Sequence, residues 1–247
     1  MRVAVVGVTG AVGQTTLKIL DERKFPVTDL RAFASERSVG TSVVFKGEKI
    51  RVEKVGPGAF DGVDLALFSA GSAQSREYAP QAVKAGAVVV DKSNAFRMDP
   101  TVPLVVPEIN GHAVKTHRGI VACPNCTTIV TVMPLKPLHD AGRLRRVVAT
   151  SYQSVSGAGV NGIEELRQQT QAWARGEAIT PRFFPHQIAF NLIPHIDAFS
   201  PDGYTGEELK LVNETRKILE SPDLGISPTT QKFSALGCER SSRMRPT

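Results

Sequence analysis

The glycine-rich turn near the N-terminus limits the fold more than any other feature of the chain. A β-branched run, Val3–Val6, is followed at once by glycines and then by apolar residues at helical spacing over Ala11–Leu20. A buried strand that turns through glycines into a helix opens a βαβ unit, and its backbone N–H groups suit a pyrophosphate. We therefore expect a dinucleotide at Gly7, Thr9, Gly10, Ala11, Val12 and Gly13. A tight turn without a ligand remains the alternative, because the spacing is G-x-x-G-x-x-G and not G-x-G-x-x-G.

The alternation of strands and helices continues through the first half of the chain. Residues on either side of Lys46-Gly47 alternate in polarity, which predicts a hairpin within Thr41–Val55. The pattern as a whole is typical of an α/β fold with a Rossmann-type doubly wound parallel sheet. The further strands are expected at Leu30–Ala34, Asp64–Phe68 and Ala87–Val90, and the helix between the last two at Ser75–Ala85.

The pattern changes close to Cys123, where long helices and a single long strand replace the short βαβ units. We expect an α+β second domain there. The predicted division is residues 1–125 for a nucleotide-binding domain, 126–230 for the second domain and 231–247 for a divergent basic tail without regular structure. The second-domain elements are expected at Thr127–His139, Arg145–Ser154, Gly162–Ala174 and Glu207–Leu219.

Composition excludes several classes of protein. With 247 residues and 41% hydrophobic content the chain can bury a substantial core, but no apolar run approaches the 18 residues of a membrane span. Half of the net charge of +6 lies in the last 17 residues, and no aromatic side chains are interleaved with basic ones, so nucleic-acid binding is not expected. An odd set of three cysteines and no secretory signal indicate a cytoplasmic protein.

The residues after the second expected strand bear on the choice between NAD and NADP. An NAD site usually has an acidic residue there for the ribose 2′-hydroxyl, whereas this chain has Ser35-Glu36-Arg37-Ser38. A guanidinium flanked by two hydroxyls suits a 2′-phosphate. Ser35, Arg37 and Ser38 therefore favour NADP, with Glu36 as a competing ribose ligand.

Cys126 is the candidate nucleophile. It follows Cys123-Pro-Asn125 at the expected start of a helix, where Asn125 would cap the helix and the helix dipole would favour the thiolate. A zinc site would need a second Cys/His pair at suitable spacing, and none is near, so no metal is expected. A thioredoxin-like C-x-x-C and a buried structural cysteine remain as alternatives.

Several motifs occur together in the order found in aspartate-semialdehyde dehydrogenases. The chain resembles that family over about its first 230 residues, and it lacks the Asn-Pro-Gly-Cys setting typical of N-acetyl-γ-glutamyl-phosphate reductase. The motifs are Gly7–Gly13, Ser35–Ser38, Ser69–Ser72, Asp91–Arg97, Val106–Asn110, Pro124–Thr127, Tyr152–Gly159, Phe190–His195 and Glu207–Lys210.

The resemblance implies NADPH-dependent reduction of L-aspartyl-4-phosphate to L-aspartate 4-semialdehyde, within the synthesis of lysine, threonine, methionine and diaminopimelate. Cys126 would form the acyl-enzyme thioester, and Gln153 would orient the substrate beside it. The second domain would serve catalysis and dimerisation, in a dimer or tetramer, although this chain lacks part of it.

The resemblance also assigns the substrate and nicotinamide contacts. Arg97 and Lys210 match the cations that hold the phosphate, and Glu207 matches the acid that meets the substrate amino group. Ser156-Gly157 lies where the family's backbone approaches the nicotinamide. Without the other motifs, Glu207 and Lys210 would be read as an exposed helical ion pair.

The resemblance is lost after Thr230. Continuing the family register places Lys232 where the family has a carboxylate-binding arginine, and Glu239 where it has a general acid/base histidine. Neither residue can take over the role, because lysine gives no bidentate fork and a carboxylate is no imidazole. The tail is therefore expected to be out of frame, and the alternative to the enzyme is a catalytically impaired NADP-binding fragment.

Overall fold

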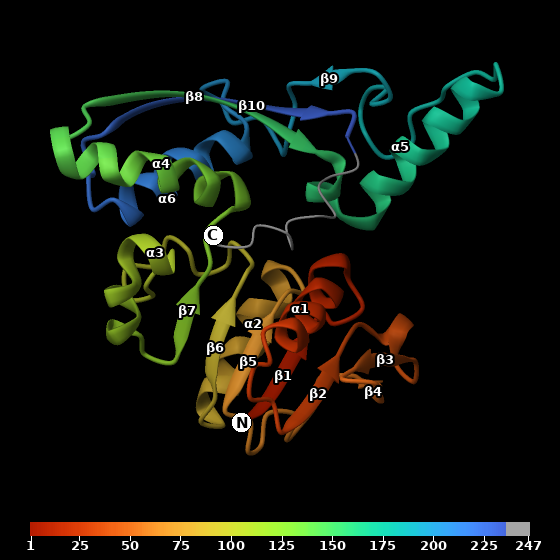
Figure 1. The fold of residues 1–247 in the computed structure, drawn as a ribbon, viewed down its shortest axis with the longest axis vertical. Helices are drawn as coiled ribbons and strands as arrows, with labels where there is room; N and C mark the ends of the chain where they lie inside the picture. The colour runs from red at the N-terminus through yellow and green to blue at the C-terminus, as the bar shows by residue number, and fades with distance from the viewer. Residues whose placement is uncertain (236–247) are drawn as a thin grey trace. The chain divides into compact units, whose positions relative to one another are not determined.

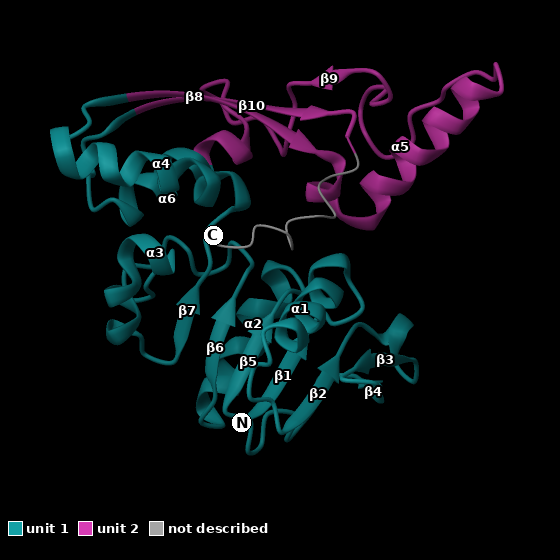
Figure 2. Ribbon diagram, viewed as in Figure 1, with its two compact units in different colours: residues 1–146, 210–225 teal, residues 147–209, 226–247 magenta. Residues whose placement is uncertain are grey.

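The computed structural model describes residues 1–235, and these residues form two compact units. Unit 1 comprises residues 1–146 and 210–225, and unit 2 comprises residues 147–209 and 226 onward (Figure 2). Within residues 1–235 no helix combines the length and the hydropathy needed to cross a membrane.

Unit 1 is built on a seven-stranded sheet in the order β3-β4-β2-β1-β5-β6-β7 (Figure 1). Neighbouring strands run parallel except β3, which pairs antiparallel with β4. The predicted hairpin is present, and Lys46 and Gly47 turn it with positive φ angles of 50° and 83°. The strands are β1 (Arg2–Val6), β2 (Asp29–Phe33), β3 (Ser42–Phe45), β4 (Glu48–Glu53), β5 (Leu65–Phe68), β6 (Val88–Asp91) and β7 (Ile120–Ala122).

Helices cover both faces of this sheet. Alternate side chains of β1 enter different cores: Val5 packs in one cluster with Leu17 of α1 (Ala11–Glu22), and Val6 packs in another with Ala79 of α2 (Ser72–Lys84). Period-two burial on both faces is the reason that β1 reads as a continuous apolar run. The doubly wound α/β fold expected from the sequence is confirmed.

A third core in unit 1 brings α4 (Cys126–Gly142) together with the C-terminal half of α6 (Gly206–Ile218). Val132 of α4 and Ile218 of α6 lie in one buried cluster with Val102 and Leu104. The sequence placed a domain boundary at 125/126, whereas this packing assigns α4 to unit 1. The difference arises because α4 packs on Val102 and Leu104, which belong to the predicted first domain, and its own sequence pattern does not show this contact. The shorter helices of unit 1 are η1 (Glu36–Ser38), α3 (Pro107–Asn110) and η2 (Gly111–Thr116).

Unit 2 is built on a three-stranded sheet in the order β8-β10-β9. Helix α5 lies between β8 and β9 in the chain. Its core joins Leu166 of α5 with Val155, Ile188 and Ile193. A buried polar side chain ties α5 to the following loop: Gln169 Oε1 accepts hydrogen bonds from the backbone N–H groups of Ile188 and Ala189 at 2.9 and 3.0 Å. The elements are β8 (Arg146–Ser154), η3 (Val155–Ala158), α5 (Gly159–Ala174), β9 (Leu192–Ile193) and β10 (Gly225–Phe233).

Strand β10 continues past the point at which the sequence placed the start of a tail without regular structure. Gln231–Phe233 belong to the strand, and Lys232 and Phe233 pair with β9. The buried positions at this end alternate, but Thr230 and Lys232 occupy them, so hydropathy alone does not reveal the strand. For these three residues the prediction was wrong. Ser234 and Ala235 follow without regular structure, and residues 236–247 of the predicted tail lie outside the described part of the chain.

The turn between β1 and α1 depends on two glycines. Gly7 has φ +86°, and a Cβ placed there would lie 2.6 Å from Ser69 O at the end of β5. A Cβ on Gly13 would overlap Gly7 O and lie 2.7 Å from Val8 Cα. Helix α1 therefore packs against the turn at a distance that no larger residue permits.

Replacing Gly13 with alanine is expected to lower the free energy of unfolding by about 1–3 kcal/mol, because the added methyl group overpacks a rigid backbone contact. Urea denaturation of the purified chain measures the change. Gly142→Ala is the matched control, since its Cβ would meet nothing within 4 Å at the end of α4. An equal effect of the two substitutions would contradict the steric explanation.

Candidate active site

The crevice at the carboxyl ends of β1 and β5 is the first part of the candidate site. The strand order reverses direction between these two strands, and ligands of doubly wound sheets bind at that point. A cavity of about 210 Å³ opens there. Sequence reasoning named Gly7 and Ser35 among its lining residues but missed Gln74 and Tyr78. Their spacing of four residues on one face of α2 was the available signal.

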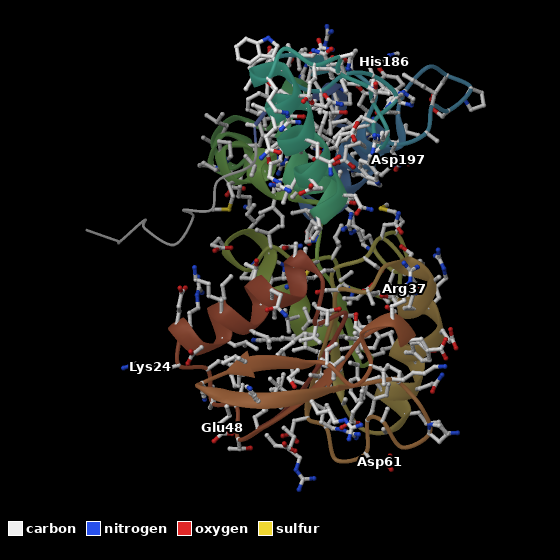
Figure 3. The ribbon with its side chains drawn as sticks, turned by 90° about the vertical axis from the view of Figure 1, so that its right-hand side faces the viewer. Lys24, Arg37, Glu48, Asp61, His186 and Asp197 are labelled. Atoms are coloured by element: carbon white, nitrogen blue, oxygen red, sulfur yellow. The ribbon has the colours of Figure 1, made fainter. Side chains whose placement is uncertain are left out.

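The predicted cofactor residues of the two loops meet beside this cavity. Thr9 Oγ1 donates a hydrogen bond to Ser38 Oγ at 3.3 Å, which joins the glycine turn to η1. Arg37 is exposed, and Figure 3 shows it at the end of unit 1 opposite to Asp61. Arg37 follows Ser35 and Glu36, which line the cavity, and its own side chain reaches solvent.

Glu36, the competing ribose ligand, is paired with a cation. The Lys54 ammonium donates a hydrogen bond to Glu36 Oε1, and this bond lowers the pKa of the exposed Glu36 carboxyl below its ordinary value. Lys54 also lines the cavity, and sequence reasoning did not name it. A 2′-phosphate at η1 would therefore meet two cations, one of them already shared with a carboxylate.

The start of α1 offers backbone groups to an anion. Gly10 is the N-cap residue, and no side chain among residues 1–235 caps the helix there. A Cβ on Gly10 would meet only Gly7 O, at 3.4 Å, so the surrounding protein does not by itself require glycine at this position. Ala11 and Val12 form the first turn, and the Val12 side chain is exposed. An uncapped helix start next to open space fits a pyrophosphate.

Asn125 caps α4 and makes Cys126 its first residue. Asn125 Oδ1 accepts the N–H groups of Thr127 and Thr128 at 2.8 and 3.4 Å. Cys126 is exposed, and its thiol lies 4.0 Å from Thr127 Oγ1. The predicted cap is confirmed, and the helix continues to Gly142 although it contains Pro134 and Pro137.

Cys123 has a different environment from Cys126. It is partly buried, and this burial raises the pKa of its thiol, while the nearby Lys92 ammonium acts in the opposite direction. Burial also lowers the pKa of Lys92, whose Nζ donates to Thr16 Oγ1 at 2.6 Å. Cys123 therefore fits the alternative of a buried structural cysteine, whereas the exposed Cys126 fits the predicted nucleophile.

Arg97 lies beneath the surface and is held by two partners. Its side chain is 9% exposed; Nη1 donates to Glu214 Oε1 at 2.9 Å, and Nη2 donates to Lys92 O at 2.9 Å. Its Nε is buried and has no hydrogen-bond partner among the described residues. Sequence reasoning missed Glu214, because an acid on the apolar side of an amphipathic helix gives no local sign of its distant partner.

Gln153 and Glu207 lie together in unit 2. Gln153 Nε2 donates to Glu207 Oε1 at 2.8 Å, and Glu207 is 7% exposed in the first turn of α6. Lys210 follows on the same helix and belongs to unit 1. This amide–carboxylate pair forms a polar, partly buried site in unit 2. Sequence spacing alone could not show the pairing, because the two residues are 54 positions apart.

The turn after β8 contains Ser156 and Gly157, and Lys232 of β10 lies beside it. Ser154 and Ser156 share a hydrogen bond of 2.7 Å between their hydroxyl oxygens. Lys232 is 4% exposed, its Nζ donates to Ser154 O at 3.4 Å, and a Cβ on Gly157 would lie 3.2 Å from that Nζ. Lys232 therefore contacts the turn assigned to the nicotinamide. Glu239 lies outside the described residues.

No group of three or more His, Cys, Asp or Glu side chains in residues 1–235 is placed to hold an ion. The two cysteines of the C-x-x-C segment are free thiols.

Comparison with known proteins gives a consistent result over nearly the whole chain. The family model "Semialdehyde dehydrogenase, NAD binding domain" matches residues 2–117, and "Semialdehyde dehydrogenase, dimerisation domain" matches residues 135–239. An aspartate-semialdehyde dehydrogenase of Aquifex aeolicus is 52% identical over 232 residues, covering 92% of this chain and 68% of that protein.

Solved structures agree with this result. Aspartate semialdehyde dehydrogenase II of Vibrio cholerae, complexed with ASA, is 46% identical with a TM-score of 0.92, over 95% of this chain and 70% of that one. The Candida albicans enzyme with NADP is 25% identical with a TM-score of 0.68, over 94% and 67%. With these sequence and structural matches, the chain belongs to the aspartate-semialdehyde dehydrogenase family.

Proposed function

We propose that this protein reduces L-aspartyl-4-phosphate to L-aspartate 4-semialdehyde with NADPH, and catalyses the reverse reaction with inorganic phosphate. The observation that carries the proposal is the exposed Cys126 at the capped start of α4, in the same unit as the glycine turn. A helix start of this kind favours a thiolate nucleophile. The reaction serves the synthesis of lysine, threonine, methionine and diaminopimelate.

The chemistry follows from the position of the thiol. The Cys126 thiolate attacks the acyl carbon, the bond from that carbon to the phosphate oxygen breaks, and the chain holds the acyl group as a thioester. NADPH, when bound, supplies the hydride that reduces the acyl carbon. Breakage of the carbon–sulfur bond then releases the aldehyde and returns the thiolate.

The other polar groups hold the ends of the substrate. Glu207, whose carboxylate already accepts Gln153 Nε2, would take the substrate amino group, and Gln153 would orient the acyl group. Arg97 and Lys210 would bind the phosphate, and the Nε of Arg97, which has no partner among residues 1–235, supports an anion there. These assignments rest on family motifs, with the observed pairs as support.

NADP is the proposed form of the nucleotide. Arg37 is exposed beside the crevice, Ser38 is joined to Thr9, and the only acid of η1 is already paired with Lys54. A related enzyme is known with NADP. Ser156 and Gly157 are proposed to contact the nicotinamide end.

We further propose a homodimer or tetramer that works in the cytoplasm. The match of residues 135–239 to a dimerisation-domain model supports the oligomer. Free thiols such as those of Cys123 and Cys126 persist in a reducing compartment, which supports the location. The competing function is an NADP-binding protein with impaired catalysis, and buried Lys232 in place of the family's arginine is the observation in its favour.

Phosphate-dependent NADPH production from aspartate semialdehyde tests the reaction. Cys126→Ala is expected to lower the rate by at least about 10³-fold, because it removes the nucleophile, whereas Cys123→Ala, the matched control, retains it. Absorbance at the NADPH band follows the reaction. NADPH binding without turnover in the unaltered chain would instead favour the impaired protein.

Alkylation by iodoacetamide at neutral pH compares the two thiols directly. Cys126 is expected to react at least about 10-fold faster than Cys123, because it is exposed and because burial raises the pKa of Cys123 and so lowers its thiolate fraction. Tandem mass spectrometry of the shared peptide measures both rates. Equal rates would count against the assignment of roles.

Arg37→Ala tests the choice of nucleotide. The dissociation constant for NADPH is expected to rise roughly 10–100-fold, the value of one charged hydrogen bond, and that for NADH less than about threefold. Fluorescence titration gives both constants. Arg51→Ala, at an exposed arginine of β4, is the control and should change neither. A parallel loss of NADPH and NADH affinity would contradict a 2′-phosphate contact.

A further inference from the structure

We propose that Glu214 is a positioning residue that fixes the phosphate-binding Arg97 relative to the segment that carries Cys126. Glu214 lies on α6 and is 2% exposed. Its Oε1 accepts Arg97 Nη1 at 2.9 Å, and its Oε2 accepts the Asn125 N–H at 2.6 Å. One carboxylate thus joins two segments of unit 1 that lie 117 and 89 residues away from it in the chain. The inference rests on the proposed function.

The bond to Asn125 fixes the start of α4, where Cys126 is the first residue. The backbone N–H of Asn125 is bound by Glu214, while its side chain accepts the N–H groups of Thr127 and Thr128. Both the main chain and the side chain of Asn125, the residue before Cys126, are therefore held by hydrogen bonds. A shift of Glu214 would move the start of α4 and the thiol with it.

The bond to Arg97 leaves donors available for an anion. Of the five guanidinium N–H groups, the observed bonds to Glu214 and Lys92 use two. The buried Nε has no partner among residues 1–235. Because Glu214 balances the charge of Arg97, the buried guanidinium is stable without substrate and keeps one orientation.

A second residue of α6 fixes the segment that carries Arg97. Lys217 Nζ donates to the carbonyl oxygens of Arg97, Asp99 and Val102 at 2.7, 2.7 and 2.9 Å. Lys217 follows Glu214 by three residues and therefore projects from the same side of the helix. Residues of α6 thus bind both the main chain and the side chain of Arg97. An isolated ion pair would fix the side chain alone.

Glu214→Gln tests the proposal, because it removes the charge while keeping the shape. The measurement is the rate of Cys126 alkylation by iodoacetamide at increasing concentrations of inorganic phosphate. In the unaltered chain phosphate should slow the reaction. In Glu214→Gln the half-protective phosphate concentration should rise at least tenfold. Arg97→Ala should show the same loss, and combining both substitutions should add little, because Glu214 acts through Arg97.

Glu165→Gln is the matched control. Glu165 is also buried, at 5% exposure, and its Oε1 accepts Gln169 Nε2 and the Arg182 N–H, but it lies in the core of unit 2. Glu165→Gln should lower the thermal midpoint while leaving phosphate protection of Cys126 as in the unaltered chain. If Glu214 had only a structural role, Glu214→Gln would likewise lower the thermal midpoint without changing phosphate protection.

The outcomes separate this proposal from the proposed function. If phosphate fails to protect Cys126 in the unaltered chain, the phosphate site itself is refuted, whatever Glu214 does. If phosphate protects both the unaltered chain and Glu214→Gln at the same concentration, the positioning role is overturned. Should Glu214→Gln fail to fold, Glu214→Asp keeps the charge on a shorter side chain. Protection of Glu214→Asp equal to that of the unaltered chain, or failure of both variants to fold, would also overturn the role.

Discussion

The close approach of backbone to backbone at Gly7 and Gly13 is the constraint on which the first unit depends. Gly7 passes the end of β5 and Gly13 packs on the turn itself, and neither position has room for a Cβ. This contact brings the start of α1 to the place where the strand order reverses. The cavity beside Gly7 and the uncapped start of α1 lie at this contact. The predicted nucleotide site thus depends in part on main-chain packing.

Much of the sheet could be predicted from the sequence, because local patterns determine it. The period-two burial of β1, the helical spacing of α1 and the turn at Lys46-Gly47 each depend on neighbouring residues. The N-cap at Asn125 is similarly local, since its partners are two and three residues away. Local rules of this kind also placed β8, α5 and α6 in the second half of the chain.

Long-range polar pairs lay beyond such patterns. Glu214 faces a partner 117 residues away, and Lys54, which follows β4, meets Glu36 of η1 from 18 residues away. The end of β10 was missed for a related reason: Thr230 and Lys232 fill inward positions that apolar residues usually occupy. Family motifs named Arg97 but not its partner Glu214, and they named Gln153 and Glu207 but not the hydrogen bond between them. Pairing geometry is information that only the folded chain contains.

The uncapped start of α1 has a consequence for the lifetime of the protein. Backbone donors at a helix start that no described side chain caps need another partner, and water or an anionic ligand can provide it. A ligand that binds only the folded state shifts the folding equilibrium in proportion to its concentration. The nucleotide-free chain is therefore expected to open locally and to be degraded sooner by proteases. Nucleotide supply would in this way help to set how much of the protein a cell retains.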